Sequence, residues 1–402
     1  MPMRENRPSR PPTIVISGWY GCGNVGDDAL LDAIVAGFRE RLGPDVIFNV
    51  LTEAPRTTAA LYAEDSRILP FPHHSFTTRR GQAALFLRGG IGPYLTALRN
   101  ADLFVLGGGG LIQDANGVGN LLRYLDDCLI AEWLGTPSMV FGIGVSPLVT
   151  ARGKWLTRAI CNRVSAITAR DKDGAQVLID AGVRADRLEA TADPALLLEP
   201  ATTSAPEIEA LAIRMAGEPH PLIVCPRPRT TWSRIDDASW STLMDELAKF
   251  CDESRARFGT RVLFIPFMKD DCAVIGDIKR RMKSASEAWA LNRPPRPRDA
   301  LRLIAQSRYV LGMRLHSLIF SASQSVPMIS VNYAPKVGSF AQEVDPTGAT
   351  YLEKDFRAEP ALSHIAAWEE NYDGRRARLV DLVAPRKAAA RRNFDRAIQL
   401  LG

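Results

Sequence analysis

The segment TIVISGWYGCGNVGDDALLDAI, residues 13–34, decides the fold. Its β-branched run at 13–16 predicts a buried strand, and the apolar pattern at 29–34 predicts a helix. The turn between them contains G-x-G-x-x-G at Gly21, Gly23 and Gly26, which is the spacing of a dinucleotide-binding loop. A strand, a glycine-rich turn and a helix in this order indicate the first unit of a parallel α/β sheet.

Two acidic residues in this turn argue against a dinucleotide. In a dinucleotide loop the pyrophosphate lies at the helix N-terminus, where free N–H groups and the helix dipole favour an anion. Asp27 and Asp28 occupy that place and would repel a phosphate, although Glu53 follows the second strand as a ribose-binding acid would. Two hypotheses remain for these carboxylates: they cap the helix, or one of them accepts hydrogen bonds from substrate hydroxyls.

The bulk composition fits a globular protein of two domains. The chain has 402 residues, of which 46% are hydrophobic, enough for two cores of about 200 residues each. The first eleven residues lack the apolar region of a signal peptide, and no stretch of about 18 apolar residues predicts a membrane span. The six cysteines show no C-x-x-C spacing, which argues against a zinc site or a disulfide framework. We therefore expect a cytoplasmic protein without a bound metal.

Basic residues gather only near the C-terminus. Residues 375–396 contain eight Lys or Arg and two acidic residues, Asp381 and Asp395. A solvated helix face explains this pattern, and weak contact with the inner face of an anionic membrane is the alternative. Nothing in the sequence resembles a nucleic-acid-binding module, so no nucleic-acid partner is expected.

Short apolar runs alternate with helical patterns along most of the chain, which predicts parallel sheets. In the first half the predicted strands are 13–16, 46–51, 103–106, 138–141 and 165–169. In the second half they are 222–225, 261–265, 309–311 and 328–331, with helices at 300–307 and from 317. The Pro-, Ser- and Thr-rich segment 199–221 predicts a linker between the halves.

The fold class that follows is α/β, with two Rossmann-like doubly wound domains that face a cleft. We expect a flexible tail at 1–12, an N-terminal domain at 13–200, a C-terminal domain at 201–360 and basic helices at 361–402. Ligands of such sheets bind at the carboxyl ends of the strands. The residues that follow each strand are therefore the candidates for a site.

In the first half, two such segments carry polar residues. VLGGGGLIQD at 105–114 combines four glycines, which let a ligand approach the backbone, with Gln113 and Asp114. Arg170 follows the strand at 165–169. An arginine in this position is commonly half of a surface ion pair, and in a cleft it would bind an anion.

In the second half, VLGMRLHSLIFSASQSVPMISVNYAPKVGSF at 310–340 is the most informative stretch. Arg314 and His316 flank Leu315 and are expected on one side of an extended segment, just before a helix. Tyr333 and Lys336 follow the next strand and reach the same end of the sheet. A guanidinium, an imidazole and free backbone N–H groups suit a phosphate or a carboxylate. A buried structural histidine is the alternative for His316, and the nearby cations favour the anion site.

The chain resembles the polysaccharide pyruvyl transferases. The resemblance rests on motifs between residues 13 and 340, in family order: GWYGCGNVGDDALL, VLGGGGLIQD, FGIGVSP, TARDKDG, ADPALLL, Arg227 after its strand, GMRLHSLIFSA and PMISVNYAPKV. It implies transfer of the enolpyruvyl-derived group of phosphoenolpyruvate to two hydroxyls of a saccharide in exopolysaccharide or cell-envelope synthesis. The product is a cyclic pyruvate ketal, phosphate is released, and no cofactor is needed. The implied fold is similar to that of the two-Rossmann GT-B glycosyltransferases.

The resemblance also implies roles for individual residues. His316 would be the catalytic acid or base, with Arg314 and Lys336 beside it. The residues implied for phosphoenolpyruvate are Arg227, Arg314, Arg170, Lys336 and Tyr333. Those expected on the acceptor side are Asn24, Asp27, Asp28, Trp19, Gln113 and Asp114. Ala334 stands where family members often carry Asp, and Pro226 precedes Arg227, which puts the shape of the donor pocket in question.

Two other functions are compatible with the same pattern. A nucleotide-sugar glycosyltransferase would have the same two-domain shape, although the second half shows no obvious acidic ribose clamp. A non-catalytic binding protein that kept the fold is the other, and the intact Arg314, His316 and Lys336 argue against it. The sequence leaves open which sugar is the acceptor, whether it is lipid-linked, and the oligomeric state.

Overall fold

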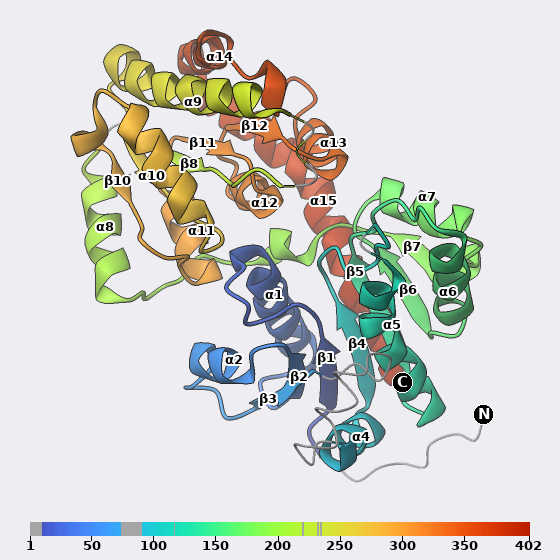
Figure 1. Ribbon diagram of the computed structural model, residues 1–402. Helices are drawn as coiled ribbons and strands as arrows, with labels where there is room; N and C mark the ends of the chain where they lie inside the picture. Colours follow the sequence, from blue (N-terminus) through green and yellow to red (C-terminus); the bar gives the residue numbers. More distant parts are fainter. Residues whose placement is uncertain (1–9, 74–90, 116, 219–220, 231–232, 234) are drawn as a thin grey trace. The chain divides into compact units, whose positions relative to one another are not determined.

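The computed structural model describes residues 10–73, 91–115, 117–218, 221–230, 233 and 235–402 (Figure 1). The chain forms two compact units. The first contains the described residues up to Cys22, then Leu30–Pro194 and Ala389–Gly402. The second contains Gly23–Ala29 and Ala195–Ala388. The short segment Gly23–Ala29, from the glycine-rich turn, therefore belongs to the second unit.

The first unit is built on a parallel sheet, which in the described part of the chain has seven strands in the order β3-β2-β1-β4-β5-β6-β7. The strands are β1 Thr13–Ser17, β2 Ile47–Thr52, β3 Ile68–Pro72, β4 Leu103–Gly107, β5 Ser138–Ile143, β6 Ala166–Ala169 and β7 Leu188–Ala190. The central strands β1, β4 and β5 are buried along their whole length. Burial on both faces explains why their sequences are continuous apolar runs and do not alternate.

Helices cover both faces of this sheet. They are α1 Val25–Leu42, α2 Pro55–Leu61, α4 Ile91–Asn100, α5 Val118–Trp133, α6 Ala151–Cys161 and α7 Lys172–Asp180. One core joins α4, α5 and α6 to side chains such as Val15, Phe104 and Val140. Side-chain caps define the starts of two helices, because Thr150 accepts from Gly153 N and Asp171 accepts from Gly174 N.

The second unit repeats the architecture with a parallel sheet of six described strands, in the order β10-β9-β8-β11-β12-β13. The strands are β8 Pro221–Cys225, β9 Arg261–Phe264, β10 Trp289–Ala290, β11 Tyr309–Gly312, β12 Met328–Asn332 and β13 Ala349–Leu352. Numbered within each unit, both sheets begin 3-2-1-4-5-6, which is the Rossmann order. The predicted α/β class with two doubly wound Rossmann-like sheets is therefore confirmed.

The helices of the second unit also form two layers. They are α8 Pro206–Ala216, α9 Asp237–Phe258, α10 Asp271–Arg281, α11 Pro297–Ala305, α12 Leu315–Ser323, α13 Pro335–Val344, α14 Ala358–Glu370 and α15 Tyr372–Leu401. Figure 1 shows α9 beside α14, and both share one core with α10 and the strands. Within the described residues, each helix is too short or too polar to span a bilayer.

The structure corrects the prediction for residues 199–221. This segment was expected to be a linker, but it contains α8, whose buried residues are Ile208, Leu211, Ala212 and Met215. Their spacing is that of an amphipathic helix, with Pro206 in its first turn. The compact units divide at Pro194 and Ala195, so α8 belongs to the second unit.

The last helix, α15, contributes to both units, with the division at Ala388 and Ala389. In the first unit, the centroid of the Phe394 ring lies 5.6 Å from that of Phe38 and 4.9 Å from that of Phe141, and both contacts are edge-on. Several basic residues of α15 have partners: Arg375 pairs with Asp345, Arg386 with Glu343 and Arg392 with Glu189. Residues 361–402 are thus helical, as expected, and much of their charge is paired within the chain.

Candidate active site

The carboxyl edge of the second sheet places two arginines on neighbouring strands. β8 and β11 are adjacent, at the point where the strand order reverses. Arg227 lies two residues after β8, and Arg314 lies two residues after β11. Ligands of doubly wound sheets bind outside the strands at this reversal point. Burial is the largest cause that lowers the pKa of Arg227, and the positive charge of Arg314 lowers it further.

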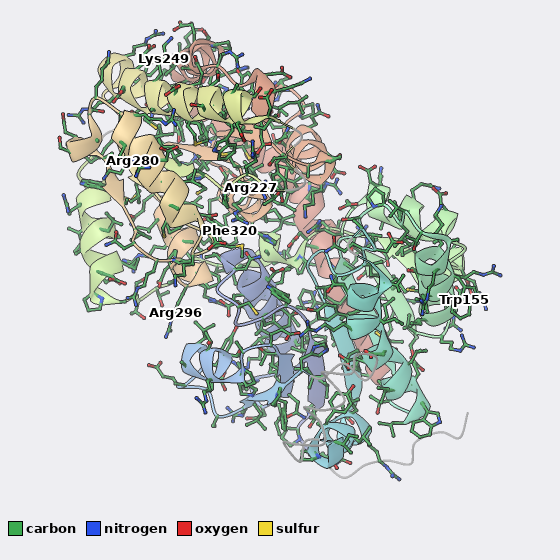
Figure 2. All side chains as sticks on the ribbon, in the orientation of Figure 1. Trp155, Arg227, Lys249, Arg280, Arg296 and Phe320 are labelled. Atoms are coloured by element: carbon green, nitrogen blue, oxygen red, sulfur yellow. The ribbon has the colours of Figure 1, made fainter. Side chains whose placement is uncertain are left out.

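Arg227 is buried, with 4% of its surface exposed, and its side chain lies within the second unit (Figure 2). The guanidinium carbon lies 3.5 Å from the centroid of the Tyr333 ring. Nη2 donates to Thr230 Oγ1 at 3.0 Å, and Nη1 donates to Ser233 Oγ at 3.5 Å. Among the described residues, Nε has no hydrogen-bond partner. The aromatic ring and the hydroxyls therefore orient this cation without neutralising it.

Among the described residues, the carboxylate at ion-pair distance from Arg227 is that of Glu353. Its Oε1 lies 4.0 Å from Arg227 Nη1 and accepts a hydrogen bond from Ser233 at 3.2 Å. Burial raises the pKa of Glu353, although Ser233 and Arg227 act in the opposite direction. The Glu353 carboxylate is thus at the limit of ion-pair distance from Arg227, and burial disfavours its charged form. The charge of Arg227 is met only in part.

Arg314 has a different environment, because its guanidinium forms a forked ion pair with Asp271. Nε lies 3.2 Å from Asp271 Oδ2, and Nη2 donates to Oδ1. Asp271 is fully buried and also accepts from the backbone N–H groups of Phe267 and Met268 at 2.9 Å. The pair joins the segment after β9 to the segment after β11. The remaining nitrogen, Nη1, contacts Met268 Sδ at 3.2 Å.

His316 lies in the first turn of α12, so the prediction of an extended segment is wrong at this residue. The helix begins at Leu315, two residues earlier than expected, and Arg314 is its N-cap residue. Ser317 reaches back with both its N–H and its hydroxyl to Arg314 O, which closes this turn. Leu315 is buried and anchors the turn in the core. The expected helix N-terminus beside Arg314 and His316 is present.

The first turn of α1 lies against His316 in the second unit. A Cβ built on Gly26 would come within 2.2 Å of His316 Nδ1. Asn24 caps this turn, because its Oδ1 accepts from Gly26 N at 3.1 Å and its amide donates to Asp27. Asp28 is buried, and its N–H donates to Asn24 O. Asn24 is thus the helix cap, and Asp27 supports the cap.

Tyr333 and Lys336 both follow β12, as expected from the sequence. The Tyr333 ring makes a cation–π contact with the Arg227 guanidinium. Lys336 lies in the first turn of α13 and is exposed. The structure therefore brings Arg227, Tyr333, Arg314 and His316 to one edge of one sheet. This edge offers guanidinium groups that suit an anion and an imidazole that can carry a proton.

Four of the predicted residues belong to the first unit. Trp19 is exposed and Gln113 is half-buried. Asp114 is buried and holds the start of α6: it accepts from Val149 N, Thr150 N and the Thr150 hydroxyl. Burial opposes the charge of Asp114, but these hydrogen bonds lower its pKa overall.

Arg170 is also buried, and its guanidinium faces two carboxylates. Nη1 lies 3.4 Å from Asp193 Oδ2, and Nε lies 3.5 Å from Asp171 Oδ2. A Cβ on Gly144 would come within 2.5 Å of Arg170 Nη2, so the glycine of this loop makes room for the arginine. Arg170 thus has internal partners, in contrast to Arg227. Among the described residues, no cluster of three or more His, Cys, Asp or Glu could hold a metal ion.

A sequence model of a known family matches most of the chain. The polysaccharide pyruvyl transferase model matches residues 24–335, a span that includes Asn24, Arg227, Arg314, His316 and Tyr333. The chain belongs to the polysaccharide pyruvyl transferase family. Lys336 lies one residue beyond the matched span, and Trp19 lies before it. No curated protein sequence matches the chain.

Solved structures with the same fold are distant in sequence. HepE from Anabaena, in complex with UDP and glucose, is 13% identical, has a TM-score of 0.56 and covers 97% of each chain. A putative UDP-N-acetylglucosamine 2-epimerase from Listeria monocytogenes is 11% identical with a TM-score of 0.64, covering 97% of this chain and 96% of its own. A glycosyltransferase from Rickettsia africae is 13% identical with a TM-score of 0.55, covering 97% of this chain and 96% of its own. At these identities the likeness establishes the fold of this pyruvyl transferase family member.

Several polar residues that the structure reveals were missed by the sequence analysis. In the second unit the missed residue is Glu353, which faces Arg227. Asp271 was visible in the sequence as one of three charged residues after the strand at 261–265, but its pairing with Arg314 was not. In the first unit, a buried group at the carboxyl ends of β1, β2 and β3 consists of Ser17, His73, Tyr94 and Asp127. The half-buried Glu53, which the sequence analysis noted after the second strand, contacts this group through His73. One signal was available, because Asp126 and Asp127 interrupt the apolar pattern of α5. Their partners lie far away in the chain and could not be identified from spacing.

Proposed function

We propose that this protein transfers the enolpyruvyl-derived group of phosphoenolpyruvate to two hydroxyls of a saccharide. The methylene carbon of the donor gains a proton, and the oxocarbenium-like carbon beside it is attacked by one sugar hydroxyl. A second hydroxyl then displaces phosphate. One new C–H bond and two new C–O bonds replace the π bond of the enol, the bond to the phosphate oxygen and the two hydroxyl O–H bonds. The products are a cyclic pyruvate ketal and inorganic phosphate.

The incompletely neutralised Arg227 carries this proposal. Phosphoenolpyruvate has a carboxylate and a phosphate, and a guanidinium binds either group with two parallel hydrogen bonds. Arg227 is held on the Tyr333 ring with Nε unused by the described residues, so it can receive one of these groups without losing a partner. Arg314 is already paired with Asp271, and we assign it to positioning the turn that carries His316.

His316 would supply the proton to the methylene carbon. An imidazole is a common general acid in enzymes, which suits this role. Arg314, two residues earlier, is paired with Asp271 and fixes the start of the helix that carries the imidazole. The sugar hydroxyls release the protons that restore the acid, so the reaction balances without a cofactor.

Release of phosphate tests the function directly. The purified protein is mixed with phosphoenolpyruvate and a panel of saccharides, and inorganic phosphate is measured together with the mass of the sugar product. We expect phosphate only when donor and a suitable acceptor are both present, with one pyruvate ketal formed for each phosphate. Neither phosphate nor ketal from any acceptor, together with no binding of phosphoenolpyruvate, would contradict the proposal.

A nucleotide-sugar glycosyltransferase is the second candidate, because HepE with the same fold is described in complex with UDP and glucose. Thermal unfolding separates the two functions. A ligand at 100 times its Kd stabilises the folded state by about 2.7 kcal/mol. We expect phosphoenolpyruvate to raise the Tm and UDP to leave it unchanged at equal concentration. The reverse result would favour the glycosyltransferase.

Tyr333 offers a prediction about donor binding. The Tyr333→Leu variant removes the ring that supports Arg227, and we expect the KM for phosphoenolpyruvate to rise about 5- to 30-fold, because a desolvated cation–π contact is worth about 1–2 kcal/mol. The Tyr333→Phe variant keeps the ring and should stay within about twofold of wild type. Steady-state phosphate release measures both. Equal losses in the two variants would assign the role to the hydroxyl and not to the ring.

A further inference from the structure

We propose that Gly26 is a positioning residue for His316: the first turn of α1 holds the imidazole in place, and residue 26 has to lack a side chain for it to do so. The proposal rests on the proposed function only in that His316 is taken as the proton donor. The contact itself lies within the second unit and can be tested without any turnover.

The steric observation is specific. A Cβ on Gly26 would lie 2.2 Å from His316 Nδ1, 2.6 Å from Cγ and 2.9 Å from Cε1. All three distances are shorter than a real methyl group tolerates. Gly26 has no positive φ, in contrast to Gly21 and Gly23, which have φ values of +74° and +72°. The backbone at residue 26 would thus accept alanine, and the three atoms nearest to a side chain there all belong to the imidazole.

The turn that carries Gly26 is fixed on both sides. Val25 N donates to Phe267 O at 2.9 Å, which ties the turn to the segment after β9. Phe267 N in turn donates to Asp271, the partner of Arg314. Arg314 precedes His316 by two residues, so these contacts link the turn of Gly26 to the turn that carries the histidine. A methyl group at residue 26 would therefore have to displace the imidazole or break these links.

This contact explains the third glycine of the G-x-G-x-x-G motif. In dinucleotide-binding proteins the third glycine permits close packing of helix and strand. In this chain the space above Gly26 is taken by the imidazole of His316. The motif that resembles a nucleotide loop therefore serves to accommodate a histidine that lies 290 residues later in the sequence.

The experiment compares Gly26→Ala with Gly119→Ala. Gly119 is the second residue of α5, as Gly26 is of α1; each follows a valine, and a Cβ on Gly119 meets nothing within 4 Å. We expect Gly26→Ala to lower kcat about 10- to 100-fold with KM for phosphoenolpyruvate within about threefold, because displacement of a reacting group by about 1 Å costs up to 10²-fold. Gly119→Ala should retain wild-type kcat and KM.

A spectroscopic readout tests the contact independently of activity. The chain has five histidines, so ¹⁵N-histidine labelling gives few imidazole signals, and a His316→Asn variant assigns that of His316. Gly26→Ala should shift the His316 signals and leave those of His73 unchanged, whereas Gly119→Ala should shift neither. Unchanged His316 signals in Gly26→Ala would overturn the proposal. If the wild-type protein does not use phosphoenolpyruvate, the proposed function is wrong, but the histidine signals still test the contact between Gly26 and His316.

If Gly26→Ala alone is too unstable to assay, the double variant Gly26→Ala/His316→Ala still tests the contact. In the wild-type background we expect Gly26→Ala to lower the Tm by about 2–6 °C. In the His316→Ala background the ring is gone, and the same substitution should leave the Tm unchanged or raise it, because alanine favours a helix over glycine. An equal loss of Tm in both backgrounds would show that the methyl group clashes with something other than His316.

Discussion

Replacing His316 with asparagine is expected to lower kcat for phosphate release from phosphoenolpyruvate by about 10²–10⁴-fold, the usual contribution of one positioned acid or base. Asparagine keeps a polar side chain in the first turn of α12 but cannot deliver a proton. Because we assign binding of the anion to Arg227, the KM should change little. Steady-state kinetics with a saturating acceptor measure both constants.

The matched variant for this prediction is Arg227→Gln, which removes the buried cation and keeps a shorter side chain that can still form hydrogen bonds. We expect it to raise the KM for phosphoenolpyruvate and to abolish the increase in Tm that this donor causes. His316→Asn should retain that increase, since binding does not need the proton. Near-normal turnover of His316→Asn would exclude this histidine as the acid.

The central strands of both sheets could be predicted from the sequence, and the edge strands could not. All nine predicted strands are present, because runs such as TIVI in β1 and LIV in β8 are buried on both faces. The four strands that were missed, β3, β7, β10 and β13, are the edges of the two sheets. β3 has the sequence ILPFP, with two prolines that an edge strand tolerates, and β10 has only two residues. Edge strands are partly exposed and carry no continuous apolar run.

The candidate site was predictable as a set of residues and not as a set of contacts. Arg227, Arg314, His316 and Tyr333 follow central strands, so the topology alone brings them to one edge. Their partners depend on side-chain packing, which spacing does not encode. Asp271 was one of three charged residues after β9 in the sequence, and only the structure distinguishes it as the partner of Arg314.

A second large effect is expected in the first unit, where His73→Leu should lower the free energy of unfolding by about 3–5 kcal/mol, the usual result of removing one partner from a buried charged pair. The His73 ring lies between two carboxylates: Nε2 is 2.9 Å from Asp127 Oδ2, and Nδ1 is 3.1 Å from Glu53 Oε1. Leucine fills the volume and leaves both carboxylates without this cation. Urea unfolding, with amide exchange of β1 and β2 to report on the first unit, measures the loss.

The pH dependence of this stability has a definite sign. Burial alone would lower the pKa of His73, but Asp127 and Glu53 outweigh it and raise the pKa from 6.5 to about 10. A raised pKa in the folded state means that the stabilisation is fully present below about pH 6.5 and is lost as the pH rises through 10. The difference in unfolding free energy between wild type and His73→Leu should therefore shrink from pH 7 to pH 10.

His364 provides the matched control for both measurements. It is half-buried, and no carboxylate in the described part of the chain pairs with it. Burial lowers its pKa, so it should be neutral at pH 7. His364→Leu removes an imidazole of the same size and should cost far less than His73→Leu, with no loss of effect between pH 7 and pH 10. If the two substitutions cost the same, or if the cost of His73→Leu is constant across this range, His73 is a neutral packing residue. The carboxyl ends of β1, β2 and β3 would then be held together by the hydrogen bonds that Ser17 and Tyr94 donate to Asp127, without a buried cation.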